Sequence, residues 1–156
     1  MDQKIVGIAE LAVCRAPQQL ACLGLGSCVA AIVYDPVAKI GGMVHVLLPH
    51  LANNGKEEKY ADSGVRKLIK EMLRKGARKE NMRAKLVGGA QMFKNMELST
   101  SDIGRDNHLS AAKALHDLGI PVVASDVGGS RGRSAYLDTA SGRVTVKTAF
   151  EPDRVI

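Results

Sequence analysis

Aromatic residues are scarce in this chain of 156 residues, which has no tryptophan, two phenylalanines and three tyrosines. Proteins that bind single-stranded nucleic acids without sequence preference stack the bases on aromatic side chains, so this chain is poorly equipped for that function. The 22 lysines and arginines exceed the 16 aspartates and glutamates, which gives a formal charge of +6. That charge favours acidic partners without saying which.

Long apolar runs are also missing. None approaches the roughly 20 residues that cross a bilayer as a helix. The first four residues lead directly into a strand pattern without a signal-peptide pattern, so we expect a cytosolic protein. Cysteine is limited to Cys14, Cys22 and Cys28. Three cysteines form an odd set rather than a disulfide framework, and in a reducing compartment we expect free thiols.

The length fits one domain spanning residues 1–156, without a repeat or a linker. Apolar runs predict short strands at Ile5–Val13, Leu20–Leu25, Val29–Tyr34, Ile40–Leu48, Arg83–Val87, Ile120–Ser125, Ser134–Asp138 and Val144–Phe150. The third and fourth of these are apolar on both faces, which indicates a sheet covered on both sides and a core of at least three layers.

Two amphipathic helices are expected between these strands. In the first, apolar residues recur at helical spacing from Val65 to Leu73, with Asp62 or Ser63 as the N-cap. The second runs from about Leu109 to Leu118, with Asn107 as a candidate cap. Residues 92–102 show no clear pattern. The chain is therefore mixed α/β.

A cysteine and a histidine lie on either side of a predicted hairpin. A glycine-loosened turn runs into an apolar strand at Cys28, and His45 follows seventeen positions later. Asp35 followed by proline predicts a turn between two apolar runs. If Asp35 pairs with Ala38, paired numbers sum to 73 and Cys28 falls opposite His45, with Cβ atoms roughly 5 Å apart. A β-bulge at residues 41–42 would shift this register by one and separate the two side chains.

The two side chains together suit nucleophilic catalysis. A thiolate attacks carbonyl carbon, and a nearby imidazole is the usual means of generating it. Gly24 and Gly26 permit a sharp turn, so that the N–H of Cys28 and a neighbouring N–H could face an oxyanion, and Ser27 could add a hydroxyl. A small residue at the start of a buried strand is also commonly a packing residue. Spacing alone leaves both interpretations open.

Two other chemistries fit less well. A phosphatase loop needs an arginine shortly after the nucleophile, and the six residues after Cys28 contain none. A zinc site could recruit Cys22, Cys28, His45 and His50. However, the gap between the cysteines is wider than usual, and strand alternation directs the two histidines to opposite faces. We predict no metal site.

Three further features are interpreted as structural. His108 and His116 lie on the second helix as surface or helix-end residues. The segment 128–133 lacks the spacing and the ending of a P-loop, and indicates a tight turn with exposed arginines. Basic residues on the first helix are typical of a solvated face.

Short motifs follow one another along most of the chain in a fixed order: Leu23–Val29, Asp35-Pro36, His45–Pro49, Lys59–Asp62, Gly88–Ala90, Ile103-Gly104 with Asn107, and Asp126–Gly129. Each is weak alone, but the ordered set resembles CheD, the family of chemoreceptor glutamine deamidases. The resemblance implies a single-domain layered α/β sandwich, for which we predict a mixed, largely antiparallel sheet core.

The resemblance also implies a reaction, which is hydrolysis of selected glutamine side chains on cytoplasmic chemoreceptor helices to glutamate and ammonia. Some members also act on methyl-glutamate esters. Cys28 is then the nucleophile that forms a thioester, and His45 is the base. Neither a metal nor an organic cofactor is implied. A CheC-type phosphatase is an implied partner, whereas nucleic acid and membrane insertion are not expected.

One position departs from the family pattern. A threonine commonly stands six residues before the nucleophile as the third catalytic residue, and here Cys22 takes that place. A thiol is a weaker hydrogen-bonding group than a hydroxyl, so either Cys22 fills the third position or a backbone carbonyl does. Oxidation could also join Cys22 to Cys28. The alternative function is a non-catalytic adaptor that binds receptors or a CheC-type phosphatase through exposed loops.

Overall fold

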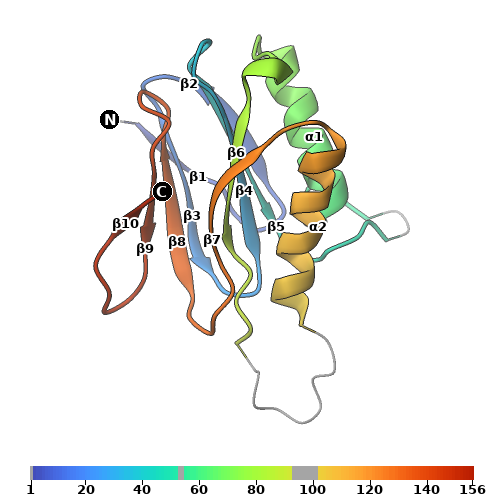
Figure 1. Ribbon diagram of the computed structural model, residues 1–156, viewed down its shortest axis with the longest axis vertical. Helices are drawn as coiled ribbons and strands as arrows, with labels where there is room; N and C mark the ends of the chain where they lie inside the picture. Colours follow the sequence, from blue (N-terminus) through green and yellow to red (C-terminus); the bar gives the residue numbers. More distant parts are fainter. Residues whose placement is uncertain (1, 53–54, 93–101) are drawn as a thin grey trace.

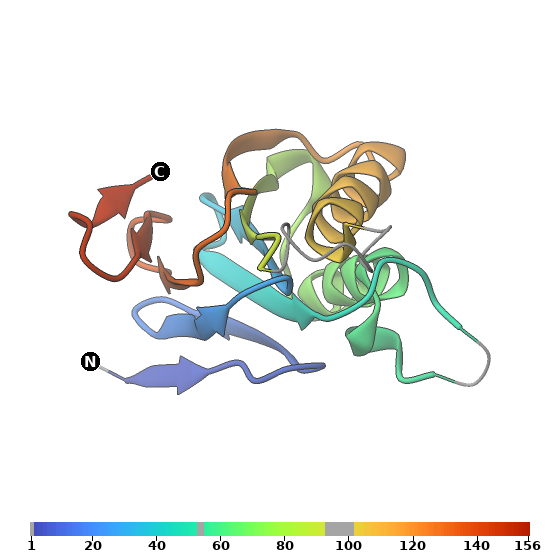
Figure 2. The same ribbon diagram turned by 90° about the horizontal axis from the view of Figure 1, so that it is seen from below.

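The computed structural model describes residues 2–52, 55–92 and 102–156. These residues form two five-stranded sheets and two main helices, arranged in three layers (Figures 1 and 2). The helices cover one face of a central sheet, and the second, outer sheet packs on its other face. Both chain termini lie on the side of the outer sheet (Figure 2).

The central sheet has the order β2-β5-β4-β6-β7 and the outer sheet the order β1-β3-β8-β9-β10. The central strands are β2 (Leu11–Arg15), β4 (Val29–Asp35), β5 (Ile40–Val46), β6 (Arg83–Gly88) and β7 (Val122–Val127). The outer strands are β1 (Gln3–Ile5), β3 (Gln19–Leu25), β8 (Arg133–Asp138), β9 (Val144–Lys147) and β10 (Arg154–Val155). The helices are α1 (Ala61–Arg74) and α2 (Ile103–Asp117), with short 3-10 turns η1 (Glu57–Lys59) and η2 (Lys79–Asn81).

Strand pairing is antiparallel except between β1 and β3 and between β6 and β7. The predicted layered α/β sandwich with a mixed, largely antiparallel core is therefore confirmed. Among the described helices, none is long and apolar enough to cross a membrane.

Several predicted boundaries were wrong. The expected strand Ile5–Val13 is two strands in different sheets, because the chain turns between them, with Ala9 at a φ of 61°. Helix α1 begins at Ala61 with Tyr60 as its N-cap, rather than after Asp62 or Ser63. The unplaced segment 92–102 lies almost entirely outside the described residues.

The start of α2 also differs from the prediction. The helix begins at Ile103, and the side chain of Asp102 caps it by accepting a hydrogen bond from the N–H of Arg105 at 2.9 Å. Asn107, the predicted cap, lies inside the helix and is fully buried. This change moves Asn107 from a helix end to the interface with the central sheet.

Strand β5 is buried along its whole length, as the apolar pattern on both its faces predicts. Gly42 faces the helices, where an added Cβ would lie 2.7 Å from Cδ1 of Leu68. Gly41 faces the outer sheet, where an added Cβ would lie 2.7 Å from Cδ2 of Leu137. The glycines therefore allow both neighbouring layers to approach β5 closely. Strand alternation then turns His45, four residues after Gly41, toward the outer sheet.

Candidate active site

The hairpin of β4 and β5 positions the two predicted catalytic residues. Its pairs run without interruption from Asp35 with Ile40 to Val29 with Val46, so paired numbers sum to 75. The predicted sum of 73, with Cys28 directly opposite His45, was wrong by two residues, and the pairing continues through residues 41–42 without the alternative bulge. Because the side-chain period of a strand is two, this shift leaves both side chains on the same face of the sheet.

The longer turn has a local cause. The side chain of Asp35 accepts hydrogen bonds from the N–H groups of Val37 at 2.8 Å and Ala38 at 2.9 Å. Lys39 completes the turn with a φ of 53°. An aspartate that binds the backbone ahead of it stabilises such a turn, so Ala38 is inside the loop rather than opposite Asp35.

Cys28 lies immediately before β4 and is 8% exposed, in the core between the two sheets. The end of β6 holds its backbone, since the N–H of Gly89 donates to the carbonyl of Cys28 at 2.8 Å. Gly88 has a φ of 112°, and an added Cβ there would clash with the carbonyl of Cys28. The N–H of Cys28 donates no hydrogen bond to another residue of the described chain, which leaves it available to a ligand.

His45 is 3% exposed, and among the described residues its ring is bound at one nitrogen. Its Nδ1 lies 3.1 Å from the carbonyl oxygen of Val6. A carbonyl can only accept, so Nδ1 carries the hydrogen and Nε2 carries the lone pair. Nε2 is buried and has no hydrogen-bond partner within the described parts of the chain. This is the tautomer that a base acting through Nε2 requires.

The pKa values favour an uncharged pair at rest. Burial lowers the pKa of His45, an effect that the Val6 carbonyl and the charge of Glu10 partly offset. Burial raises the pKa of the Cys28 thiol, which its own backbone N–H partly offsets. Desolvation disfavours whichever form is charged, so near neutral pH the site holds a thiol and a neutral imidazole.

Cys22 is fully buried on β3, in the same intersheet core as Cys28. Burial raises the pKa of Cys22, and a thiolate at Cys28 would raise it further. The structure thus brings Cys22 to the site, but the group at Nδ1 of His45 is the carbonyl of Val6. All three cysteines of the chain are free.

Sequence reasoning missed the contacts that Asn107 makes. Its Nδ2 donates to the carbonyl of Ser27 at 2.8 Å and to the carbonyl of Leu47 at 2.9 Å. The available signal was a polar residue in line with the apolar positions Ala111 and Ala114, which predicts a buried amide as well as a cap.

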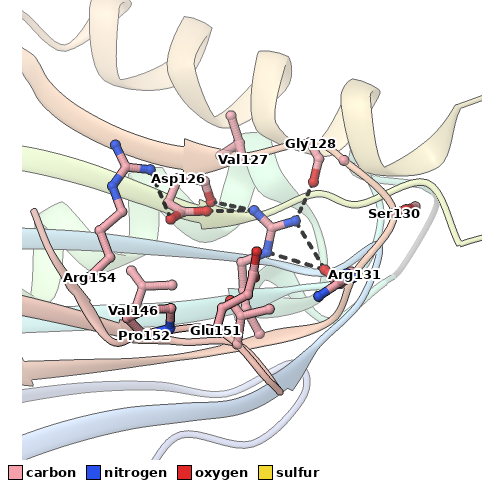
Figure 3. Close-up of a pocket in the computed structure, with 12 residues that line it drawn as sticks. Asp126, Val127, Gly128, Ser130, Arg131, Val146, Glu151, Pro152 and Arg154 are labelled. Carbon is pink, nitrogen blue, oxygen red and sulfur yellow. Dashed lines mark hydrogen bonds and ion pairs between the residues drawn. The ribbon is translucent and has the colours of Figure 1, made fainter.

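A cavity of about 500 Å³ opens beside this site, around the connection between β7 and β8 (Figure 3). Asp126 lies at its wall, where one carboxylate oxygen binds Arg133 at 2.7 Å and the other binds Arg154 at 3.1 Å. Arg133 also donates to the carbonyls of Gly128 and Arg131. Arg133 is 8% exposed, so the prediction of exposed arginines was wrong for it.

This cavity does not include Cys28 or His45, but its rim supports them. The N–H of Gly128 donates to the carbonyl of Gly88 at 3.0 Å. Arg133 therefore fixes a loop that is bonded to the end of β6, and β6 in turn holds Cys28.

The site lies at the end of the molecule where β4 begins and where β5, β6 and β7 end (Figure 1). A buried thiol and an imidazole whose Nε2 has no partner among the described residues lie in a three-layer α/β sandwich, and proteins of the class that uses a Cys–His pair as nucleophile and base carry these two groups. The family model described as "CheD chemotactic sensory transduction" matches residues 47–148. The chain belongs to the CheD family.

Three relatives agree over nearly the whole chain. Proteins from Caldanaerobacter subterraneus subsp. tengcongensis and Desulforamulus reducens are 42% and 43% identical, covering 95% and 97% of this chain and 95% and 93% of the relative. A Pyrococcus abyssi protein is 44% identical, covering 91% of this chain and 89% of the relative. Each is named "Probable chemoreceptor glutamine deamidase CheD".

Proposed function

We propose that this protein is a chemoreceptor glutamine deamidase, a cysteine-dependent protein-glutamine glutaminase. The name shared by its relatives supports the substrate. The observation that carries the mechanism is the asymmetry of His45, whose Nδ1 is bound to Val6 while Nε2 is buried without a partner in the described chain. That nitrogen lies on the same sheet face as Cys28 and can take the proton of a thiol.

The reaction runs through a thioester. As Sγ of Cys28 attacks the carbon of a glutamine amide, the thiol proton passes to Nε2 of His45. The N–H of Cys28 donates to the oxyanion that forms. His45 then returns the proton to the leaving nitrogen, which departs as ammonia. A water molecule deprotonated by His45 attacks the thioester, and the products are glutamate and the free thiol.

Val6 takes the orienting role in this scheme. Its carbonyl fixes the tautomer and the direction of the ring, as the third group of a catalytic triad does. Glu10 adds negative charge near the ring, which stabilises the imidazolium formed during attack. Cys22, in the third position of the family pattern, then packs beside Cys28 without holding His45.

The family resemblance supports a wider setting for this reaction. We place the protein in the cytoplasm as one domain of residues 1–156, acting on cytoplasmic receptor helices without a metal or an organic cofactor. Its charge of +6 suits acidic segments of those helices. A CheC-type phosphatase is the partner that the family resemblance implies. The alternative, a non-catalytic adaptor, is favoured only by the low exposure of a neutral Cys28 thiol.

Single alanine variants of the three cysteines test this proposal. Incubation with a cytoplasmic chemoreceptor fragment should convert particular glutamines to glutamate, read by mass spectrometry. Cys28→Ala should abolish the conversion, because no other group replaces the nucleophile. Cys22→Ala should retain most of it, since Val6 holds the ring, and the matched control Cys14→Ala should behave like the wild type.

Circular dichroism would verify that each variant is folded. Unchanged conversion by Cys28→Ala would rule out the nucleophile and favour the adaptor. Loss of conversion in a folded Cys22→Ala variant would indicate that Cys22, rather than the carbonyl of Val6, is the third catalytic group.

A further inference from the structure

The end of the molecule that carries Cys28 and His45 is called the catalytic end. Two chain segments meet there without backbone pairing between them. The ladder of β4 and β5 ends at Val29 and Val46, so Cys28 and Leu47 lie one position beyond it. The side chain of Asn107 continues the connection, since its amide group donates to the carbonyls of Ser27 and Leu47. One amide on α2 therefore ties the residue before Cys28 to the segment that follows His45.

The chemistry of the contact suits asparagine. The two hydrogens of its Nδ2 diverge in one plane and can meet two carbonyl oxygens at once. The carboxylate of an aspartate would place hydrogen-bond acceptors against the two carbonyl oxygens, which are also acceptors. An apolar residue would leave both carbonyls without this donor. Asn107 is fully buried, and its Oδ1 has no partner among the residues that the structure describes. A buried amide with one unpaired atom is costly, which indicates a role other than stability.

Helix α2 is anchored on both sides of Asn107. One turn earlier, Gly104 lies against the carbonyl of Ala90, where an added Cβ would clash. One turn later, the hydroxyl of Ser110 donates to the carbonyl of Pro49 at 2.7 Å. Residues three apart lie on one helix face, so these contacts hold that face against the catalytic end. Of these three residues, Asn107 alone binds both the segment of Cys28 and the segment of His45.

We propose that Asn107 is a positioning residue for the Cys28 and His45 pair. This inference rests on the proposed deamidation. By holding the carbonyls of Ser27 and Leu47 together, Asn107 fixes the separation of Sγ and Nε2. A displacement of about 1 Å between reacting groups can lower the catalytic rate about 100-fold. Loss of the Asn107 amide should therefore lower kcat and leave KM for the receptor fragment nearly unchanged.

The test compares Asn107→Ala and Asn107→Gln with the matched control Ser110→Ala, which removes a neighbouring bond of α2 to a loop. We expect kcat to fall by about 100-fold in Asn107→Ala, by less in Asn107→Gln, which keeps the amide on a longer stem, and little in Ser110→Ala. A wild-type kcat in either Asn107 variant would overturn the inference. If Asn107→Ala does not fold, the Gln variant decides by the same criterion.

A second readout separates positioning from a merely structural role. Alkylation of Cys28 by iodoacetamide is measured against pH for Asn107→Gln, His45→Ala and the double variant. If Asn107 acts through the pair, the substitution Asn107→Gln should change the pH profile of alkylation when His45 is present. The same substitution should have no effect in the His45→Ala background. Equal effects in both backgrounds would overturn the inference while deamidation by the wild type stands. If the wild type converts no glutamine, the deamidase proposal fails, and this alkylation cycle still decides whether Asn107 couples the pair.

Discussion

The two nitrogens of His45 have different surroundings, and this difference sets how the site can work. The contact with Val6 assigns the hydrogen to Nδ1, while the buried Nε2 keeps its lone pair. Burial acts on Cys28 and His45 in opposite directions, so both are uncharged at rest. The proposed mechanism therefore has no preformed ion pair, and in it the proton transfer accompanies the attack of Cys28 on the amide.

The pH profile follows from this arrangement. Because burial lowers the pKa of His45, the neutral base persists below the ordinary histidine value of about 6.5, and activity should be lost only as the pH falls through the lowered pKa. The charge of Glu10 raises this pKa, so Glu10→Gln should move the acid limb of kcat/KM to still lower pH.

Glutamine at position 10 keeps an acceptor for the N–H of Gly7, which Glu10 binds at 2.7 Å. The control Glu80→Gln alters an exposed carboxylate paired with Arg78 and should leave the profile in place. An acid limb above pH 6.5, or a shift of the limb to higher pH in Glu10→Gln, would contradict the neutral pair.

At this scale the sequence indicated the residues whose chemistry is in their side chains. Cys28 and His45 could be predicted as candidates because a thiol and an imidazole are uncommon and reactive. Val6 could not, because its part is a backbone carbonyl, which has no sequence signature. Asn107 was interpreted as a helix cap because asparagine is common at caps, and its true position depends on where α2 begins.

Among the elements, the hairpin of β4 and β5 depends on one buried carboxylate. Asp35 binds the N–H groups of its own turn through Oδ1, and its Oδ2 accepts from the N–H of Arg78 at 2.8 Å. Asp35 therefore joins the hairpin to the start of η2. The turn residues predicted a hairpin correctly, but the register depended on these side-chain bonds.

Replacement of Asp35 should destabilise the fold in a pH-dependent way. Asp35→Ala removes an ionised acceptor from three N–H groups, so the free energy of unfolding at pH 7 should fall by about 3 kcal/mol. The backbone hydrogen bonds outweigh burial and lower the pKa of Asp35. Its stabilisation is therefore present above the unfolded-state value of about 3.9 and is lost as the pH falls through the lowered pKa.

Urea unfolding at several pH values measures this effect. The gap in stability between the wild type and Asp35→Ala should be largest at neutral pH and should narrow below about pH 4. The exposed Asp153, 3.7 Å from Lys147, offers a control, since Asp153→Asn should change stability by less than about 1 kcal/mol. A gap that does not depend on pH would show that the carboxylate is not the source.

For helix α2, the sequence pattern did not predict the first turn and a half. Gly104 and Asn107 face the ends of the strands, and neither is apolar, so the periodic pattern starts only later. Close approach to the Ala90 carbonyl demands glycine at position 104. In the first turns of α2, the residues that contact the strand ends thus stand at positions where a helix usually has apolar residues. The apolar pattern by which a helix is predicted is therefore missing there.

For the whole molecule, the three layers could be predicted because strands β4 and β5 are apolar on both faces. The assignment of strands to sheets could not. The run from Ile5 to Val13 contains Gly7, but the residue with the turn's φ of 61° is Ala9, which carries no turn signal. The chain passes from the outer to the central sheet within this run. This crossing places Val6 between the sheets, where its carbonyl reaches His45.

The approach of the two sheets at Gly41 gives a test of the packing as a whole. An added Cβ would lie 2.7 Å from Cδ2 of Leu137 and 2.9 Å from Cγ2 of Thr139, so Gly41→Ala should lower the free energy of unfolding by about 1 to 3 kcal/mol. Gly132→Ala is the matched control, because among the described atoms its Cβ would meet the carbonyl oxygen of Leu25 alone, at 3.5 Å.

Thermal unfolding of the double variant Gly41→Ala with Leu137→Ala distinguishes a steric cause from a backbone one. Leu137→Ala removes the nearer clashing methyl group and leaves Cγ2 of Thr139 in place, so the alanine at position 41 should destabilise the fold less in that background than in the wild type. The same cost in both backgrounds would mean that the sheets are not held apart by this contact. Gly41 and His45 point to the same side of β5, so a wider spacing between the sheets at Gly41 should also affect His45. If the outer sheet and the carbonyl of Val6 hold the ring of His45, a folded Gly41→Ala variant should deamidate with a lower kcat and an unchanged KM.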